Sequence, residues 1–266
     1  MYSKTFQKEL VFNIRYYLIN IAAALGPFLS TQIQKVFSLK IVCLLIALIY
    51  LINFFFFLFS SIKEKSIEKS KFNYLESFSI IKQNRTYIYL LLGSVFFVFG
   101  YSQILSTIPQ YFALKLHSYA TSIYGYLLSI NGIVALTCQY FIYLLSKRYS
   151  QKLCILLGAI VLTFGLFTIG LTENIFLLTF SMIVFTIGEM LMFTTMDIRI
   201  DEITDEQNKG SYYSLLGLQN IGSLLAPIIG GLVITQFHSG IIIFSIISLI
   251  TSLSIIFIYK SNRVGF

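Results

Sequence analysis

The segment Ile41–Phe59, "IVCLLIALIYLINFFFFLF", contains no charged side chain. A helix of about twenty residues spans the roughly 30 Å hydrocarbon core of a bilayer, so this segment predicts a transmembrane helix. Similar runs recur along the chain, in which 57% of the residues are hydrophobic and 11% are charged. Soluble domains carry about 25% charged residues. The sequence therefore predicts an all-α polytopic membrane protein in contact with a lipid bilayer.

Hydropathy predicts eight transmembrane helices with short connections. Their expected ranges are 10–33, 39–60, 86–112, 121–146, 153–171, 175–197, 212–236 and 240–260. The connection over residues 61–85 is longer, polar and basic, and is typical of a loop between two helix bundles. We therefore expect two helices in residues 1–60, a central cytoplasmic loop in 61–85 and a six-helix bundle in 86–266.

The basic residues predict the orientation of these helices. With the N-terminus inside, sixteen of the 19 Lys and Arg residues fall on the inner side and three on the outer side. Loops rich in Lys and Arg face the cytoplasm, so we expect both termini there and a location in the plasma membrane. This distribution across the membrane accounts for the net charge of +8, so we expect no nucleic-acid partner.

Residue types that support enzymatic or metal chemistry are scattered. The cysteines (Cys43, Cys138 and Cys154) fall inside apolar runs, which indicates packing and not a disulfide or a metal site. His117 and His238 stand alone in short connections. The sequence contains no phosphate-binding loop and no HExxH or GxSxG motif. We expect no enzyme, no cofactor and no metal.

Two distant segments resemble one another. "NIAAALGP" (Asn20–Pro27) and "NIGSLLAP" (Asn220–Pro227) share Asn, Ile, Leu and Pro in register. They lie six spans apart, as expected for the parallel repeats of many transporters. On this interpretation the last six spans form one complete half, and the first two spans are the last two helices of the other half. Four helices at the N-terminal end of the first half would then be missing. The alternative is that the two segments resemble one another by chance.

Three segments carry a resemblance to a known family: "RYYLINIAAALGP" (Arg15–Pro27), "TIGEMLMFTT" (Thr186–Thr195) and "KGSYYSLLGLQNIGSLLAPIIGG" (Lys209–Gly231). With these segments the chain resembles the major facilitator superfamily, specifically its drug:proton antiporter type. The resemblance covers the last two-thirds of a twelve-helix member. The matching residues are Arg15, Asn20, Gly26, Pro27, Gly188, Glu189, Gly210, Tyr212, Pro227, Gly230 and Gly231. The sequence departs from the family pattern at Thr194, where proline is usual, and at Lys209, where arginine is usual.

The resemblance also suggests a cytoplasmic gate. "LSKRYSQK" (Leu145–Lys152) resembles the Asp-Arg-x-Gly-Arg-Lys loop of the family but matches it only in part, with Lys147 where aspartate is expected. A second charged cluster follows the apolar run of residues 175–197. An ion-paired latch between the two is one interpretation, and a solvated helix end is the other. The gate candidates are Arg148, Lys152, Asp197, Arg199 and Asp201.

Glu189 lies inside an apolar run, where a carboxylate costs about 2.5–3.5 kcal/mol to insert. It can persist there if it faces protein or water, or if it is protonated. One interpretation is a proton or cation site in a central cavity, and the other is a hydrogen bond that packs two helices. Met182, Met190, Met192 and Met196 surround it and suit either an apolar pocket or ordinary packing.

Other polar residues lie within the predicted spans. Together with Glu189 the cavity candidates are Gln103, Asn131, Gln139, Gln219 and Asn20, with hydrogen bonding between helices as the alternative for each. The spans 39–60, 153–171 and 240–260 are nearly featureless and would form the outer ring in the resembled fold. The candidates for helix bends and close packing are Gly26, Pro27, Pro227, Gly230 and Gly231.

We therefore expect a secondary active transporter of the major facilitator type. Its substrates would be small amphipathic compounds or drugs, and their efflux would be coupled to protons. Its two-helix first half predicts a fragment that is inactive alone, with a missing N-terminal fragment as a partner. The alternative is a non-transporting eight-helix membrane protein, such as an assembly partner or the remnant of a broken transporter gene. A membrane-embedded enzyme is a third interpretation, which the scattered catalytic residue types disfavour.

Overall fold

The computed structural model describes residues 14–15, 17–19, 21–22, 25, 37–59, 82, 84–204 and 208–264. Every regular element in these residues is a helix. Seven of the helices are long and apolar enough to cross a membrane. They confirm the all-α polytopic class and seven of the eight predicted spans. The remaining prediction, 10–33, and the central loop 61–85 fall largely outside the described residues.

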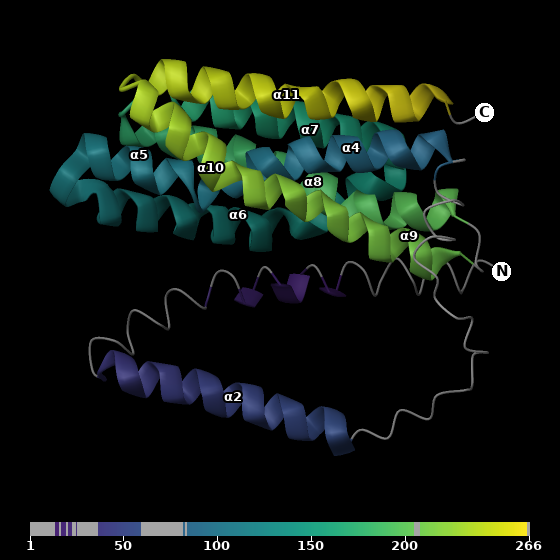
Figure 1. Cartoon of the computed structure of the whole chain (residues 1–266), viewed down its shortest axis with the longest axis horizontal. Coiled ribbons are helices and arrows are strands. Elements are labelled where there is room, and N and C mark those ends of the chain that lie inside the picture. The colour runs from purple at the N-terminus through teal and green to yellow at the C-terminus, as the bar shows by residue number, and fades with distance from the viewer. Residues whose placement is uncertain are drawn as a thin grey trace.

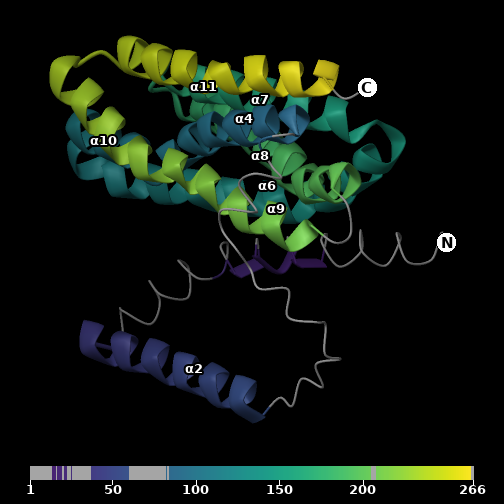
Figure 2. The ribbon, with the colours of Figure 1, turned by 45° about the vertical axis from the view of Figure 1, so that its right-hand side comes forward.

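Helix α2 (Leu39–Phe59) lies apart from the other helices in both views (Figures 1 and 2). From Lys40 to Phe59 its side chains are exposed except that of Val42. A helix that is apolar on all sides is stable when lipid or other protein surrounds it. This is the surface expected of a transmembrane helix.

The remaining six spans form one bundle, in which successive spans run in opposite directions (Figure 1). Their elements are α4 (Arg85–Tyr101), η1 (Ser102–Ile104) and α5 (Thr107–Leu116), then η2 (His117–Tyr119) and α6 (Ala120–Arg148), α7 (Gln151–Ile169), α8 (Ile175–Ile203), α9 (Lys209–Leu216), η3 (Gly217–Asn220) and α10 (Ile221–Gln236), and α11 (Gly240–Val264).

Short polar side chains begin several of these helices. Asn84 accepts a 3.0 Å hydrogen bond from the backbone N–H of Tyr87, and Asn174 accepts one of 2.9 Å from that of Phe176. Such caps satisfy amides that have no partner within the helix. The end of α8 differs from the prediction, because the helix continues beyond residue 197 to Ile203. The charged cluster is therefore part of the helix.

Two of the spans are interrupted by 3-10 turns. Pro109 in α5 has no N–H to donate to the carbonyl of Leu105, and the chain leaves α geometry at that point. The second interruption, η3, precedes Pro227, which lies inside the continuous helix α10. Ser102 and Ser223 join the two broken spans through a hydroxyl–hydroxyl contact of 2.8 Å. A 3-10 stretch within a long helix often marks a hinge.

The bundle has an outer and an inner layer relative to α2. Helices α7 and α11 lie on the side away from α2 in both views, whereas α6 and α9 lie on the nearer side (Figures 1 and 2). α7 packs mainly against α8, and α11 packs mainly against α4. The spans expected to form the outer ring, 153–171 and 240–260, thus lie on the side of the bundle away from α2.

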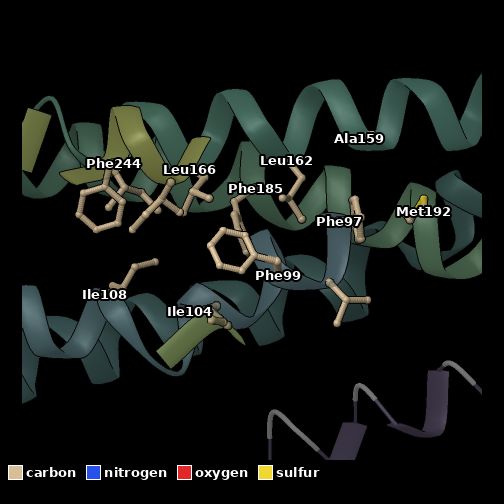
Figure 3. Close-up of a cluster of buried hydrophobic side chains, with 14 of the residues drawn as sticks. Phe97, Phe99, Ile104, Ile108, Ala159, Leu162, Leu166, Phe185, Met192 and Phe244 are labelled. Atoms are coloured by element: carbon tan, nitrogen blue, oxygen red, sulfur yellow. The ribbon is translucent and has the colours of Figure 1, made fainter. Parts of the chain in front are cut away.

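Large apolar side chains and close glycine contacts hold the bundle together. Phe97, Leu162 and Phe185 lie in the core between α4, α7 and α8 (Figure 3). Gly158 and Gly188 lie where α7 crosses α8, and a Cβ atom on either residue would collide with the backbone of the other helix. Small residues allow membrane helices to approach closely, which increases their van der Waals contact.

Basic side chains gather at one end of the bundle, here called the basic end. α6, α8 and α11 end there, and α4, α7 and α9 begin there. The basic residues at this end are Arg85, Lys147, Arg148, Lys152, Arg199, Lys209, Lys260 and Arg263. Lys115 lies at the opposite end, where α5 finishes.

Candidate functional site

Glu189 lies in the seam between α6 and α8, with its side chain turned into protein. Its residue is 5% exposed, and its Oε2 accepts a 3.0 Å hydrogen bond from Nδ2 of Asn131 on α6. The same Nδ2 donates to the hydroxyl of Thr186 over 2.9 Å, and that hydroxyl donates to the carbonyl of Met182. Asn131 therefore ties two polar groups of α8 to α6, and the carboxyl group is held in a defined place.

Aromatic rings form one side of this site. Tyr101 on α4 lies beside the turn of α8 that carries Glu189. The ring of Tyr101 packs edge-on against Phe193 at 5.0 Å and stacks on Phe185 at 6.4 Å, measured between centroids. The faces of such rings attract cations, and a phenol can share a proton with a carboxyl group. The arrangement suits binding of a proton or an organic cation.

The four methionines near Glu189 pack inside the bundle. Met182, Met190, Met192 and Met196 are all buried, and the first three are fully so. Ser94 makes a 3.9 Å contact with the sulfur of Met196. Their burial favours ordinary packing over the lining of an open pocket.

Gln103 is fully buried in the bend between α4 and α5. Its Nε2 donates to the carbonyl of Phe99 over 3.0 Å, and its Oε1 accepts hydrogen bonds from Thr107 and Ser106. A Cβ atom on Gly230 of α10 would collide with Thr107. We therefore assign Gln103 and Gly230 to the packing of this bend and leave them out of the candidate site.

The remaining cavity candidates are in different settings. Gln139 is 5% exposed and lies on α6, between Asn131 and the basic end. Gln219 is partly exposed in η3. Asn20, Gly26 and Pro27 lie outside the described residues. The structure thus brings Asn131 to Glu189 but does not bring Gln103 there.

Ion pairs occupy the basic end of α8. Asp197 lies 3.5 Å from Arg15, Arg199 lies 3.0 Å from Glu202, and Asp201 lies 2.5 Å from Lys209. The hydroxyl of Tyr213 also donates to the backbone carbonyl of Asp197 over 2.9 Å. The charged cluster is therefore paired across α8, α9 and the segment that contains Arg15.

The loop between α6 and α7 also lies at the basic end. Lys152 donates to the carbonyl of Asn262 over 3.5 Å and so connects α7 with α11, while Arg148 is exposed beside the ring of Tyr149. Lys152 and Arg199 line one pocket of about 420 Å³, whose other lining residues are Ser146, Lys147, Tyr149, Ser150, Gln151 and Glu202. At this end Asp197 pairs with Arg15, and Asp201 pairs with Lys209.

A family model described as Major Facilitator Superfamily matches residues 2–220. The chain belongs to the major facilitator superfamily. It is 32% identical over 266 residues to the uncharacterized MFS-type transporter YqjV of Bacillus subtilis (strain 168), with 96% of this chain and 63% of YqjV covered. Over 90% of the chain it is 24% identical to the B. subtilis protein YttB, and over 86% it is 25% identical to YdeE of Escherichia coli (strain K12).

These relatives, both also named uncharacterized MFS-type transporters, are longer than this chain. It spans 61% of YttB and 58% of YdeE, so it covers about three fifths of the length of the curated relatives that it matches. Membership of the superfamily and the seven apolar helices establish a multi-pass membrane protein related to transporters.

The structure adds site residues of this superfamily member that the sequence did not single out. Thr186 stands three residues before Glu189, so the helical spacing could have indicated a shared face. Tyr101 carries no comparable signal, because its approach to Glu189 depends on the packing of α4 against α8. Arg15 was part of the family resemblance, but its pairing with Asp197 spans 182 residues and has no local signature.

Proposed function

We propose that this chain is part of a proton-coupled efflux transporter for small amphipathic compounds. The observation that carries the proposal is the buried Glu189 carboxyl group, held by Asn131 within two membrane-spanning helices. A carboxyl group at such depth is costly to insert. Such groups are therefore rare in membrane helices, and those that occur commonly serve functions such as proton transfer. It lies in a segment that resembles a signature of drug:proton antiporters.

We assign the six-span bundle to the second half of the transporter and α2 to the end of the first half. The basic end faces the cytoplasm under the positive-inside rule. The activity belongs to a protein with both halves, because alternating access rocks one bundle against the other around a central site. We accordingly expect Met1–Phe266 alone not to transport.

The groups around Glu189 can serve both of its protonation states. When the carboxyl group is ionised, the N–H of Asn131 donates to it. When it is neutral, its O–H needs an acceptor, and the hydroxyl oxygens of Thr186 and Tyr101 are the candidates. An amphipathic cation could approach the same aromatic wall and compete with the proton. Such competition couples efflux of the compound to proton entry.

The pair formed by Arg15 and Asp197 is suited to a gate at the basic end. It joins α8 to the segment before α2, and its side chains are 64% and 25% exposed. Exposed ion pairs contribute about 0–1 kcal/mol, so this contact can break and re-form with little cost as the two halves move.

Efflux of a fluorescent cationic dye from cells tests the proposal. One strain expresses Met1–Phe266 alone, and another expresses the chain fused behind the first third of YqjV. We expect proton-dependent efflux from the fusion only, and its loss to background in Glu189→Gln. Glu173→Gln is the matched control, because Glu173 is exposed in the connection between α7 and α8.

Each result has a clear meaning. Full proton-dependent efflux by the Glu189→Gln fusion would contradict the assigned role of Glu189. Robust efflux by Met1–Phe266 alone would contradict the need for a longer first half. Absence of efflux from a well-expressed fusion would favour the alternative, a non-transporting membrane protein.

A further inference from the structure

A second, small cluster of buried apolar side chains lies where α6, α7 and α8 meet, between Glu189 and the basic end. Its members are Ala135 and Ile142 of α6, Cys154 of α7, and Met190 and Leu191 of α8. This cluster marks the place where the three helices converge. Polar groups stand directly beside it.

Gln139 is the first of these polar groups. It stands four residues after Ala135 and three before Ile142, so it shares their face of α6. The side chain is buried, and neither its Nε2 nor its Oε1 has a hydrogen-bond partner among the residues that the structure describes. Buried amides are nearly always bonded to protein or to ordered water.

Thr194 is the second group. It stands four residues after Met190 and three after Leu191, so it borders the same cluster from α8. Three other threonines of this region, Thr186, Thr195 and Thr204, donate to the carbonyl four residues earlier. The hydroxyl of Thr194 is buried and makes no such bond within the described chain. It therefore requires another partner.

The register of α6 against α8 places these two side chains at the same depth. Thr179 bonds to Tyr126, and Asn131 bonds to both Thr186 and Glu189, so partners on these helices differ by 53 to 58 residue numbers. The same offset puts Gln139 opposite the turn of α8 that contains Thr194.

Gln151 at the start of α7 extends the polar groups to the basic end. Its Nε2 donates to the carbonyl of Ser146 over 3.0 Å, while its buried Oε1 has no partner in the described residues. Both Gln151 and Ser146 line the pocket of about 420 Å³. Cys154, a member of the small cluster, stands one turn further along α7. Ser146 stands seven residues after Gln139 on α6, a rise of about 10.5 Å, so the pocket lies at the basic end of the same seam.

The described residues contain six buried side-chain nitrogen or oxygen atoms that have no hydrogen-bond partner there. Four of these atoms belong to Gln139, Thr194 and Gln151. We propose that water occupies the seam between α6, α7 and α8, bound by these three side chains and continuous with the pocket at the basic end. A buried water needs about two to four polar partners, and these three side chains offer four such atoms. Gln139 and Thr194 together offer donors and acceptors for more than one water molecule.

The role of this water rests on the proposed function. Thr194 stands five residues beyond Glu189, a rise of about 7.5 Å along the helix. The short side chain of Ala135 and the flexible one of Met190 lie at the intervening level of the seam. The neutral acid of Glu189 gives its proton to a water molecule at the inner end of the chain, which becomes hydronium, and Glu189 is left as a carboxylate. The seam thus releases to the cytoplasmic side the protons that enter during efflux.

Radiolytic footprinting tests the water directly, because hydroxyl radicals formed from bound water modify the side chains beside it. The protein is the purified chain in lipid nanodiscs. Met190 and Met182 are matched probes, since both are fully buried methionines of α8 and only Met190 borders the seam. We expect Met190 to be oxidised several-fold faster than Met182. Equal, slow oxidation of both would overturn the proposal.

A pair of variants locates the water. Gln139→Leu combined with Thr194→Val should lower the oxidation of Met190 to that of Met182, whereas Gln139→Asn combined with Thr194→Ser should retain it. Fast Met190 oxidation in the folded Leu/Val variant would also overturn the proposal. The footprint does not depend on transport, so loss of efflux with intact labelling counts against the proposed function and not against the water site.

Discussion

Asn131 on α6 and Glu189 on α8 are joined by a 3.0 Å hydrogen bond within the membrane-spanning part of the bundle. The bond links α6 to α8, which pack against each other in the bundle. It also gives the buried carboxyl group a partner, without which its burial would be costly. Four sets of substitutions test this and other contacts of the bundle.

Asn131→Leu should destabilise the bundle and abolish proton-dependent efflux by the fusion protein. It leaves the Glu189 carboxyl group without its amide donor, and an unsatisfied buried polar group costs about 1–3 kcal/mol. Thermal unfolding of the purified chain measures the loss. Gln110→Leu is the control, because Gln110 is exposed on α5. Equal stability of Asn131→Leu and the control would show that the bond contributes nothing.

Gly188→Val should loosen the packing of α7 against α8. A Cβ atom at Gly188 would meet the backbone of Leu162, and overpacking of this kind costs about 1–3 kcal/mol. The midpoint of thermal unfolding should fall accordingly. Gly125→Val is the matched control in α6, where no atom lies within 4 Å of the added Cβ. A similar drop in both variants would exclude a specific contact at Gly188.

Charge exchange between Arg15 and Asp197 should reveal the proposed gate. Arg15→Asp or Asp197→Arg alone brings like charges together and should slow dye efflux by the fusion, whereas the double exchange should restore part of the rate. Exposed pairs are screened by salt, so the coupling should weaken as ionic strength rises. A double exchange no better than the two single ones would remove this pair from the gate.

Ser223→Ala should slow transport more than it lowers stability. The substitution removes the 2.8 Å contact with Ser102 that joins the two interrupted spans. A single neutral hydrogen bond contributes about 0.5–1.5 kcal/mol to stability, so the protein should remain folded. Dye efflux and thermal unfolding are measured on the same fusion. Ser129→Ala, at an exposed position of α6, is the control. Unchanged efflux in Ser223→Ala would mean that this contact is not part of a hinge.

Much of the architecture was predictable from local sequence. Apolar runs such as Ile41–Phe59 specify membrane helices, because hydrocarbon excludes charges and unpaired backbone groups. The predicted outline of the six-span bundle matched the structure to within a few residues at most helix ends. α8 exceeded its predicted end because the charged residues after Asp197 are compatible with a helix once it leaves the apolar region.

The contents of the site were only partly predictable. The sequence by itself determined that Glu189 lies within a membrane-spanning helix, since an apolar segment of sufficient length surrounds it. The tertiary structure alone decided that Asn131 is its partner, that Gln103 is used in a bend, and that Arg15 meets Asp197. Local sequence sets which residues enter the membrane as helices. The rotation and register of each helix, which decide what a side chain touches, depend on packing against helices far away in the chain.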